Sequence, residues 1–226
     1  MKKNELFKHI VAIRTAKNNV VYGGAGFFVE TNDKKVFLVT ATHVARDTTK
    51  NTDIYVRNLT TGLPTSFKID QLNKMVIWLY HPIADIAILE VNDNCRLDLS
   101  AYVLSIDSFE SDFANVPERE SSLTMYGMPE VYGDLEYAPF TCDCNPASSM
   151  WVSNFDVTGS LFKCFMLDKP SIQGFSGGPV FSFSNHDTPI CYGIVHGTRK
   201  DNTGGKLAIV VHSAYLFELI DYAKSA

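Results

Sequence analysis

Ser176 stands among glycines in the segment GFSGG, residues 174–178. A serine hydroxyl is a weak nucleophile until a neighbouring base accepts its proton, and attack on a carbonyl also needs N–H donors for the oxyanion that forms. Gly174 can turn its N–H toward the same point as the N–H of Ser176, because glycine adopts backbone angles that other residues rarely reach. The segment therefore predicts an acyl-transfer site with an oxyanion hole formed by Gly174 and Ser176, although Ser-Gly-Gly is also common in ordinary turns.

Such a nucleophile requires a base and a carboxylate that orients the base. His43 follows the apolar run FLVTAT, where a histidine at a strand end is either a base or a core residue. Asp85 opens the apolar run DIAILEV, and a carboxylate buried there needs a partner. His81 precedes a proline in a loop, so we expect its side chain to be exposed. We predict His43 as the base, Asp85 as its partner and Ser176 as the nucleophile.

The elements that must position these residues are short β-strands. Apolar or alternating runs recur along the chain and are separated by Asn, Asp, Gly, Thr and Lys clusters, a pattern typical of a β-sandwich or barrel. Residues 107–120 are acidic and lack strand periodicity. We predict two β-modules joined by this segment: residues 1–106, with the base and its carboxylate, and residues 121–226, with the nucleophile. A helix is expected at 213–224, with its apolar face on the second module.

Composition argues against several classes of function. The chain has 226 residues and a formal net charge of −5, and its Lys and Arg residues are scattered. Nucleic-acid binders usually carry a basic stripe, so no nucleic-acid partner is expected. No apolar run approaches the roughly 20 residues that span a membrane, so no membrane partner is expected either. Five scattered cysteines and the lack of a signal segment favour a cytoplasmic protein.

In sequence order, the segments GAGFFVE, FLVTATHVA, HPIADIAILEV and GFSGGPV resemble the chymotrypsin/trypsin-like serine peptidases. The strings YGMP and YGIVHG and the C-terminal helix extend the similarity over nearly the whole chain. The resemblance implies an all-β fold of two six-stranded antiparallel Greek-key barrels with a cleft between them. It also implies a triad in which Asp85 holds the tautomer of His43 and His43 deprotonates Ser176, with an acyl-enzyme intermediate and no cofactor.

Two positions near the serine depart from this family, and so do the cysteines. The secreted enzymes have disulfides around the histidine and serine loops, and their absence here agrees with a reducing compartment. Phe175 stands where activatable members have an aspartate, so we expect that cleavage of the N-terminus is not the switch. Pro170 stands where trypsin has an aspartate, so cleavage after Lys or Arg is not expected.

The resemblance also implies a primary specificity pocket, formed by Pro170, Ser171, Val195, His196, Gly197 and Thr198. A histidine with Ser and Thr is similar to the glutamate-specific branch of the family. However, His196 is displaced by one position from the histidine of those enzymes, and it could instead hydrogen-bond Asp85. We therefore expect the residue that precedes the cut to be small or uncharged, in preference to acidic.

Cys142 and Cys144 form a Cys-x-Cys pattern, which some viral relatives use with a later Cys and His as a structural zinc site. His186 could supply a ligand, but no third thiol stands at a matching position, and structural zinc usually takes four ligands. We therefore expect no metal.

These observations predict a serine endopeptidase that cleaves a protein or peptide substrate. An active peptidase in the cytoplasm threatens its own cell, so we expect narrow specificity or an activating protein partner. The alternative is a peptide-binding pseudoprotease that keeps the cleft without turnover.

Overall fold

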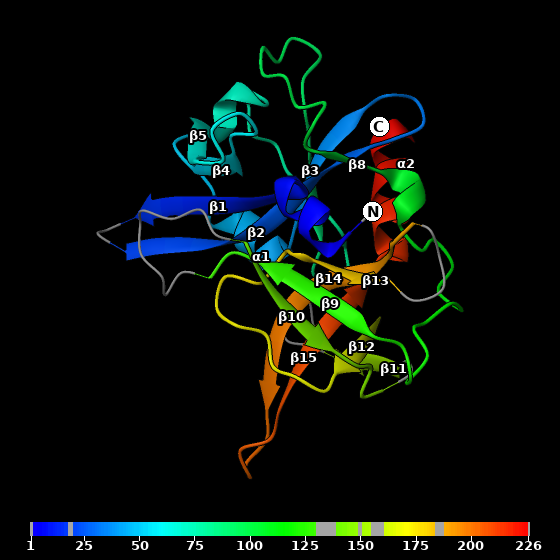
Figure 1. The fold of residues 1–226 in the computed structure, drawn as a ribbon. Helices are drawn as coiled ribbons and strands as arrows, with labels where there is room; N and C mark the ends of the chain where they lie inside the picture. Colours follow the sequence, from blue (N-terminus) through cyan, green and yellow to red (C-terminus); the bar gives the residue numbers. More distant parts are fainter. Residues whose placement is uncertain are drawn as a thin grey trace.

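Two β-sheets form the body of the molecule in a computed structural model that describes residues 2–17, 20–129, 139–148, 151–154, 161–183 and 188–225 (Figure 1). The first sheet has the strand order β5-β4-β1-β2-β3-β7-β6, with β8 paired to β2. The second has the order β10-β9-β13-β14-β15-β12-β11. Neighbouring strands are antiparallel except β2 and β8. The all-β prediction is confirmed, with eight and seven described strands where six each were expected, because short edge strands extend both sheets.

The first half of the chain supplies the first sheet. Its strands are β1 (Ile10–Lys17), β2 (Val20–Glu30), β3 (Val36–Thr40), β4 (Asp53–Arg57), β5 (Pro64–Lys68), β6 (Leu79–Tyr80), β7 (Ala87–Glu90) and β8 (Val103–Ser105). Four short helical elements accompany them: η1 (Lys3–His9) before β1, α1 (Thr42–Arg46) between β3 and β4, η2 (Ile69–Gln71) between β5 and β6, and η3 (Ile106–Ser108) after β8. Strands β3 and β7 are buried almost throughout, as strands in the interior of a sheet are when both faces are covered.

The second half supplies the second sheet and the C-terminal helix. Its elements are β9 (Leu123–Gly127), β10 (Phe140–Cys144), β11 (Trp151–Asn154), β12 (Leu161–Leu167), β13 (Pro179–Ser182), β14 (Ile190–Lys200), β15 (Lys206–His212) and α2 (Ala214–Ser225). Helix α2 begins and ends within one residue of the prediction. Its expected place on the second module alone is wrong, because α2 also packs against β6 and β7 of the first sheet.

Three apolar clusters make up the core. One lies within the first sheet and contains Phe28, and another lies within the second sheet and contains Phe165. The third joins the two halves and contains Phe27 of β2, Phe181 of β13 and Leu216 of α2. A core shared in this way fixes the two sheets against each other, which any site built from both halves requires.

All five cysteines lie in the described part of the chain, and each is a free thiol. Among the described helices, none has the length and apolar character to cross a membrane.

Candidate active site

Strand pairing brings His43 and Asp85 together. Strands β3 and β7 are antiparallel, with Thr40 opposite Ala87, so the residues just after β3 lie beside those just before β7. His43 is in the first turn of α1, which follows β3, and the Asp85 carboxylate accepts two hydrogen bonds from it. His43 Nδ1 lies 2.7 Å from Asp85 Oδ2, and the backbone N–H of His43 donates to Oδ1 at 3.1 Å.

Asp85 is a buried carboxylate that stays ionised. Its side chain is 1% exposed, and a third hydrogen bond reaches it from His196, whose Nδ1 lies 2.5 Å from the same Oδ2 atom. Burial alone would raise the pKa of Asp85, but the hydrogen bonds and charges of His196 and His43 outweigh it and hold the pKa well below its usual range. The site therefore contains a fixed negative charge beneath the two imidazoles.

His43 is the more accessible partner, with 42% of its side chain exposed. Burial lowers its pKa, whereas the hydrogen bond and charge of Asp85 and the charge of Asp47 raise it, and the result is a raised pKa. An imidazole whose Nδ1 donates to a carboxylate presents Nε2 as a proton acceptor. This is the arrangement that a general base requires.

The glycines around Ser176 are set by close backbone contacts. Gly174 has φ +94° and Gly177 has φ +86°, angles that side chains rarely allow. A Cβ at Gly174 would collide with the Met128 carbonyl, and one at Gly177 would collide with the Ala25 carbonyl oxygen. The glycines therefore allow the serine loop to lie directly on both sheets.

The serine loop offers two N–H groups to a ligand. Within the described residues, neither the N–H of Gly174 nor that of Ser176 donates a hydrogen bond. The carbonyl groups on either side are held, because Gly174 O accepts from Met128 N at 3.0 Å and Ser176 O accepts from Ala25 N at 2.8 Å. Two preset donors at one loop are suited to an oxyanion.

The hydroxyl of Ser176 points to a main-chain carbonyl. Its Oγ donates to His196 O at 3.1 Å, and among the described residues no hydrogen bond joins it to His43. The rings of His43 and His196 lie edge to face with centroids 5.8 Å apart. His196 therefore contacts the serine through its backbone and Asp85 through its side chain, so the three predicted triad residues lie around one further histidine.

The six predicted pocket residues do not all face one space. Val195 is fully buried, and the His196 ring is turned to Asp85. Ser171 and Thr198 are joined by their hydroxyl groups at 2.8 Å and by a bond from Thr198 Oγ1 to Ser171 O at 3.0 Å. A Cβ at Gly197 would meet open space. Pro170 is exposed at the end of the same loop as Ser171.

Sequence patterns did not reveal two contacts behind the site. Arg14 Nη2 donates to Met128 O at 2.6 Å and Arg14 Nη1 to Gly24 O at 3.0 Å, so this side chain ties the first sheet to the segment behind Gly174. An arginine that directly follows the apolar run Ile10–Ile13 of β1 was the available signal. His81, expected to be exposed, is 6% exposed instead, because α2 covers it.

The Cys-x-Cys pattern lies on β10, away from these residues. Burial raises the pKa of Cys144 to about 12, which disfavours the thiolate that zinc binds. Among the described residues, no group of three potential ligands includes Cys142 or Cys144. His186 lies outside the described residues.

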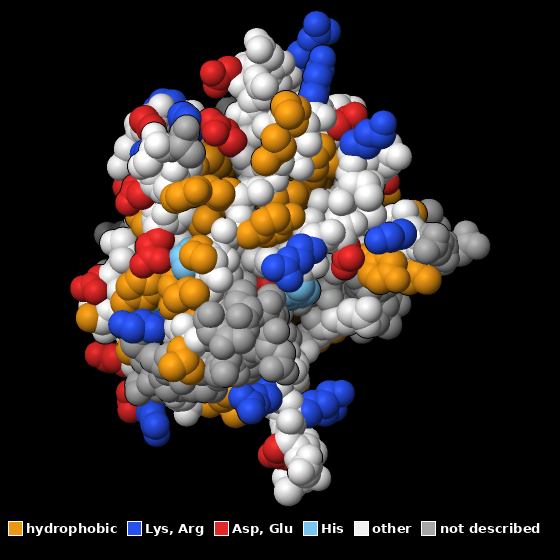
Figure 2. Space-filling view, turned by 180° about the vertical axis from the view of Figure 1, so that it is seen from behind, with side chains coloured by type: hydrophobic (Ala, Val, Ile, Leu, Met, Phe, Trp, Pro, Cys, Tyr) orange, Lys and Arg blue, Asp and Glu red, His pale blue; other side chains and the backbone are white. Residues whose placement is uncertain are grey.

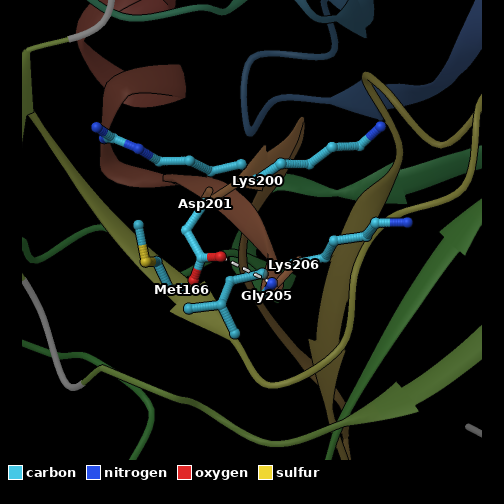
Figure 3. Close-up of a pocket in the computed structure, with 7 residues that line it drawn as sticks. Met166, Lys200, Asp201, Gly205 and Lys206 are labelled. Atoms are coloured by element: carbon cyan, nitrogen blue, oxygen red, sulfur yellow. Dashed lines mark hydrogen bonds between the residues drawn. The ribbon is translucent and has the colours of Figure 1, made fainter. Parts of the chain in front are cut away.

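A cavity of about 330 Å³ lies at the far end of the hairpin formed by β14 and β15 (Figure 3). It is lined by Met166, Arg199, Lys200, Asp201, Gly205, Lys206 and Leu207. Asp201 accepts a hydrogen bond from the backbone of Gly205 at 2.9 Å, while Lys200 and Lys206 extend away from Asp201. None of the predicted site residues lines this cavity, so it is separate from the candidate active site.

No protein-family model matches the sequence, and no curated protein matches it. Solved structures share its fold. The active form of the Rv3671c protease from M. tuberculosis aligns with a TM-score of 0.65 and 17% identity, over 96% of this chain and 82% of that chain. The inactive form of the same protease gives 0.60 and 16%, over 97% and 90%. The serine endoprotease from Yersinia pestis gives 0.55 and 14%, over 98% and 66%. At these identities the likeness establishes the fold, which is chymotrypsin-like, as the sequence predicted.

Proposed function

We propose that this chain is a serine endopeptidase with Ser176 as nucleophile, His43 as general base and Asp85 as the orienting carboxylate. The observation that carries the proposal is the buried Asp85 carboxylate, which accepts from His43 Nδ1 at 2.7 Å. The nearby serine loop has two N–H donors that no described residue engages. Solved serine proteases with the same fold support it.

In the proposed reaction, the Ser176 hydroxyl rotates from the His196 carbonyl to His43 Nε2. His43 accepts its proton as Oγ attacks the substrate carbonyl, and the N–H groups of Gly174 and Ser176 stabilise the tetrahedral oxyanion. Asp85 stabilises the imidazolium, which then protonates the leaving amine. Water then takes the place of the amine: His43 accepts its proton as it attacks the acyl carbonyl, and returns that proton to Ser176 Oγ as the ester bond breaks.

The C-terminal part of β14, residues 197–200, is a suitable place for a peptide. Among the described strands, only β15 pairs with residues 197–200. Ala208, opposite Thr198, donates its N–H to Lys169 O on the far side, so the pair is not hydrogen-bonded and Thr198 directs its own N–H and C=O away from β15. His196 O, at the same edge, contacts the candidate nucleophile. An extended substrate would add to this edge as an antiparallel strand.

We further propose that a small or uncharged residue precedes the cut. Ser171 and Thr198, two of the residues expected to line the pocket, offer only neutral hydroxyl groups, which contact each other, and the His196 ring is engaged by Asp85. An acidic side chain would therefore lack a cationic partner from these residues. Cleavage after Lys or Arg would likewise lack a carboxylate, because Pro170 offers none.

The serine loop is held by apolar packing, which bears on regulation. Phe175 is fully buried in the core of the second sheet, and a Cβ at Gly127 would collide with its ring. Such packing needs no ion pair with a newly cut N-terminus. We propose that the uncut chain reaches the active loop conformation and that specificity or a protein partner limits its activity.

On the face shown in Figure 2, Lys and Arg side chains stand singly or in small groups among acidic and apolar ones. This mixed surface supports a peptide or protein partner over a nucleic acid, which would favour a continuous basic stripe.

Labelling with a fluorophosphonate tests the proposal. The uncut chain should form a covalent adduct on Ser176 that is absent from Ser176→Ala, and peptide-library cleavage should give the residue before the cut. A chain that is labelled only after N-terminal trimming would overturn the proposed regulation. Labelling elsewhere than Ser176 would overturn the mechanism.

One observation favours a second candidate, a peptide-binding module without turnover. The Ser176 hydroxyl is hydrogen-bonded to His196 O and not to His43. If the chain binds extended peptides but is never labelled, with or without added peptide, the binding module is the correct description.

A further inference from the structure

Three potential metal ligands converge at the candidate active site. Each of His43, Asp85 and His196 offers one ligand atom, and these atoms all lie within 4.8 Å of one another. Within the part of the chain that the structure describes, this is the one group of three or more His, Cys, Asp or Glu side chains with such spacing. One carboxylate oxygen, Asp85 Oδ2, therefore contacts both imidazoles, that of His43 and that of His196.

The donor set and its surroundings suit zinc. Zinc in proteins binds imidazole nitrogen and carboxylate oxygen at about 2.0–2.2 Å, and three protein ligands with one open position are a common arrangement. Asp85 Oδ1 is held by the His43 backbone N–H at 3.1 Å, so the carboxylate is already oriented by a contact outside the ligand set.

Small shifts of the rings would bring the two nitrogen–oxygen separations to those of a zinc site. The two Nδ1 atoms lie 2.7 and 2.5 Å from Asp85 Oδ2, whereas ligands of a tetrahedral zinc ion are about 3.3 Å apart. Each separation would therefore increase by less than about 1 Å. His43 is 42% exposed and His196 17%, so the His43 side offers both a path for the ion and room for the ring to shift.

We propose that zinc binds reversibly to His43 Nδ1, Asp85 Oδ2 and His196 Nδ1, and that the bound ion blocks the base. The inhibitory consequence rests on the proposed peptidase function, but the binding does not. A neutral imidazole bound through Nδ1 carries its proton on Nε2, so the Nδ1 proton leaves, one is taken up on Nε2, and no net proton is released. An imidazolium releases one proton. In either case His43 Nε2 becomes N–H and cannot accept the proton of Ser176.

Binding is tested directly with cobalt and zinc on full-length Ser176→Ala, which needs no activity. Cobalt should bind with one equivalent and give a visible spectrum of nitrogen and oxygen ligands, and zinc should displace it. Adding His196→Ser should weaken binding at least about 10-fold, because one ligand is lost. Adding Cys142→Ser and Cys144→Ser should leave the affinity unchanged. Thiolate charge-transfer bands, or equal affinity with and without His196, would overturn the proposal.

Thermal unfolding of each variant verifies that it is folded. If the His196→Ser chain does not fold, His196→Asn serves in its place, since its amide can still donate to Asp85 without supplying an imidazole ligand.

Inhibition is tested by fluorophosphonate labelling of the chain with Ser176 intact. Zinc at the concentration that displaces cobalt should slow labelling at least about 10-fold, and a chelator should restore it. Each variant is compared with its own metal-free rate, and the ratio for His196→Ser should be close to one. Cobalt binding without any metal-free labelling would leave the zinc site intact and refute the proposed peptidase. Labelling without cobalt binding would refute the zinc site alone.

Discussion

Asp85 and Glu218 each accept a hydrogen bond from a histidine, but the two pairs are buried in opposite ways. In the candidate active site the carboxylate is 1% exposed and the His43 side chain 42%. In the other pair, 2.9 Å long, the His81 side chain is 5% exposed and the Glu218 carboxylate 51%. Which partner is removed from water decides what each pair can do, because burial disfavours the charged form of the group that is buried.

The pKa values of the two histidines shift in opposite directions. His43 has a raised pKa, since Asp85 outweighs burial, whereas burial outweighs Glu218 and lowers the pKa of His81. Neutral His81 uses Nδ1 as an acceptor for the N–H groups of Ile83 and Ala84, at 3.3 and 3.0 Å. In the proposed mechanism the buried acid thus prepares His43 for proton transfer, whereas the buried His81 shapes the loop that leads to Asp85.

The largest expected effect separates the two acids. Asp85→Asn should lower the rate of peptide cleavage by about 10⁴-fold, because an amide cannot balance the imidazolium and can force His43 into the wrong tautomer. Glu218→Gln, at the exposed acid, should change the rate by less than about twofold. Cleavage kinetics with one peptide measure both. Equal losses in the two variants would contradict the role assigned to burial.

His81→Ala should have the next largest effect, on stability. It removes the acceptor of the buried Ala84 N–H and of the partly buried Ile83 N–H. A buried N–H costs about 1–3 kcal/mol when left unsatisfied, and water reaching the Ile83 group would reduce its share. Urea unfolding followed by fluorescence measures the loss. His81→Asn places an oxygen near the position of Nδ1, so it should retain part of the lost stability. If both variants were as stable as the parent, the loop would not depend on His81.

Local constraints explain which parts of the molecule were predictable. The glycines of GFSGG are required by the chain's own backbone contacts, and the apolar runs before His43 and after Asp85 specify β3 and β7. Pairing of these strands then places the two side chains together. The two-sheet fold and the His43–Asp85 pair were therefore accessible from local patterns and the family resemblance.

Long-range contacts and irregular backbone explain the remainder. His81 is buried by α2 through Glu218, which lies 137 positions away in the chain, so its loop sequence could not reveal its burial. The direction of His196 is set by a register shift between Val195 and Gly197. Such a bulge breaks the alternation of strand faces. The sequence therefore did not decide whether the His196 side chain lines the specificity pocket or hydrogen-bonds Asp85.

The pH dependence of activity and stability should sharpen the contrast between the two histidines. Labelling of Ser176 should rise with pH through a midpoint above 6.5, because His43 must lose its proton and its pKa is raised from 6.5. Stability should respond to His81 in the acidic range. Its folded pKa lies below 6.5, so below that pH the unfolded chain binds a proton that the folded chain does not.

His81 should therefore destabilise the fold as pH falls below 6.5, by up to about 1.4 kcal/mol per pH unit until the folded pKa is reached. His9 and His212 also have lowered pKa values and add to this slope. His43 acts with the opposite sign, adding stability below pH 6.5 that is lost as pH rises through its raised pKa. Unfolding across pH should show a smaller acidic slope in His81→Asn. An unchanged slope would mean that His81 is not kept neutral by burial.

The smallest expected effect is that of Glu218→Gln on stability. Its carboxylate is half exposed, and exposed ion pairs contribute only about 0.2–1 kcal/mol, less at high salt. Near neutral pH the change should be at the low end, because neutral His81 can donate Nε2–H to an amide oxygen as well. At acidic pH the gap from the parent should widen, since Glu218 raises the pKa of His81 against burial and Gln would not. Urea unfolding at two pH values measures both differences. A large loss at neutral pH, equal in low and high salt, would show that Glu218 fixes α2 by a contact other than this ion pair.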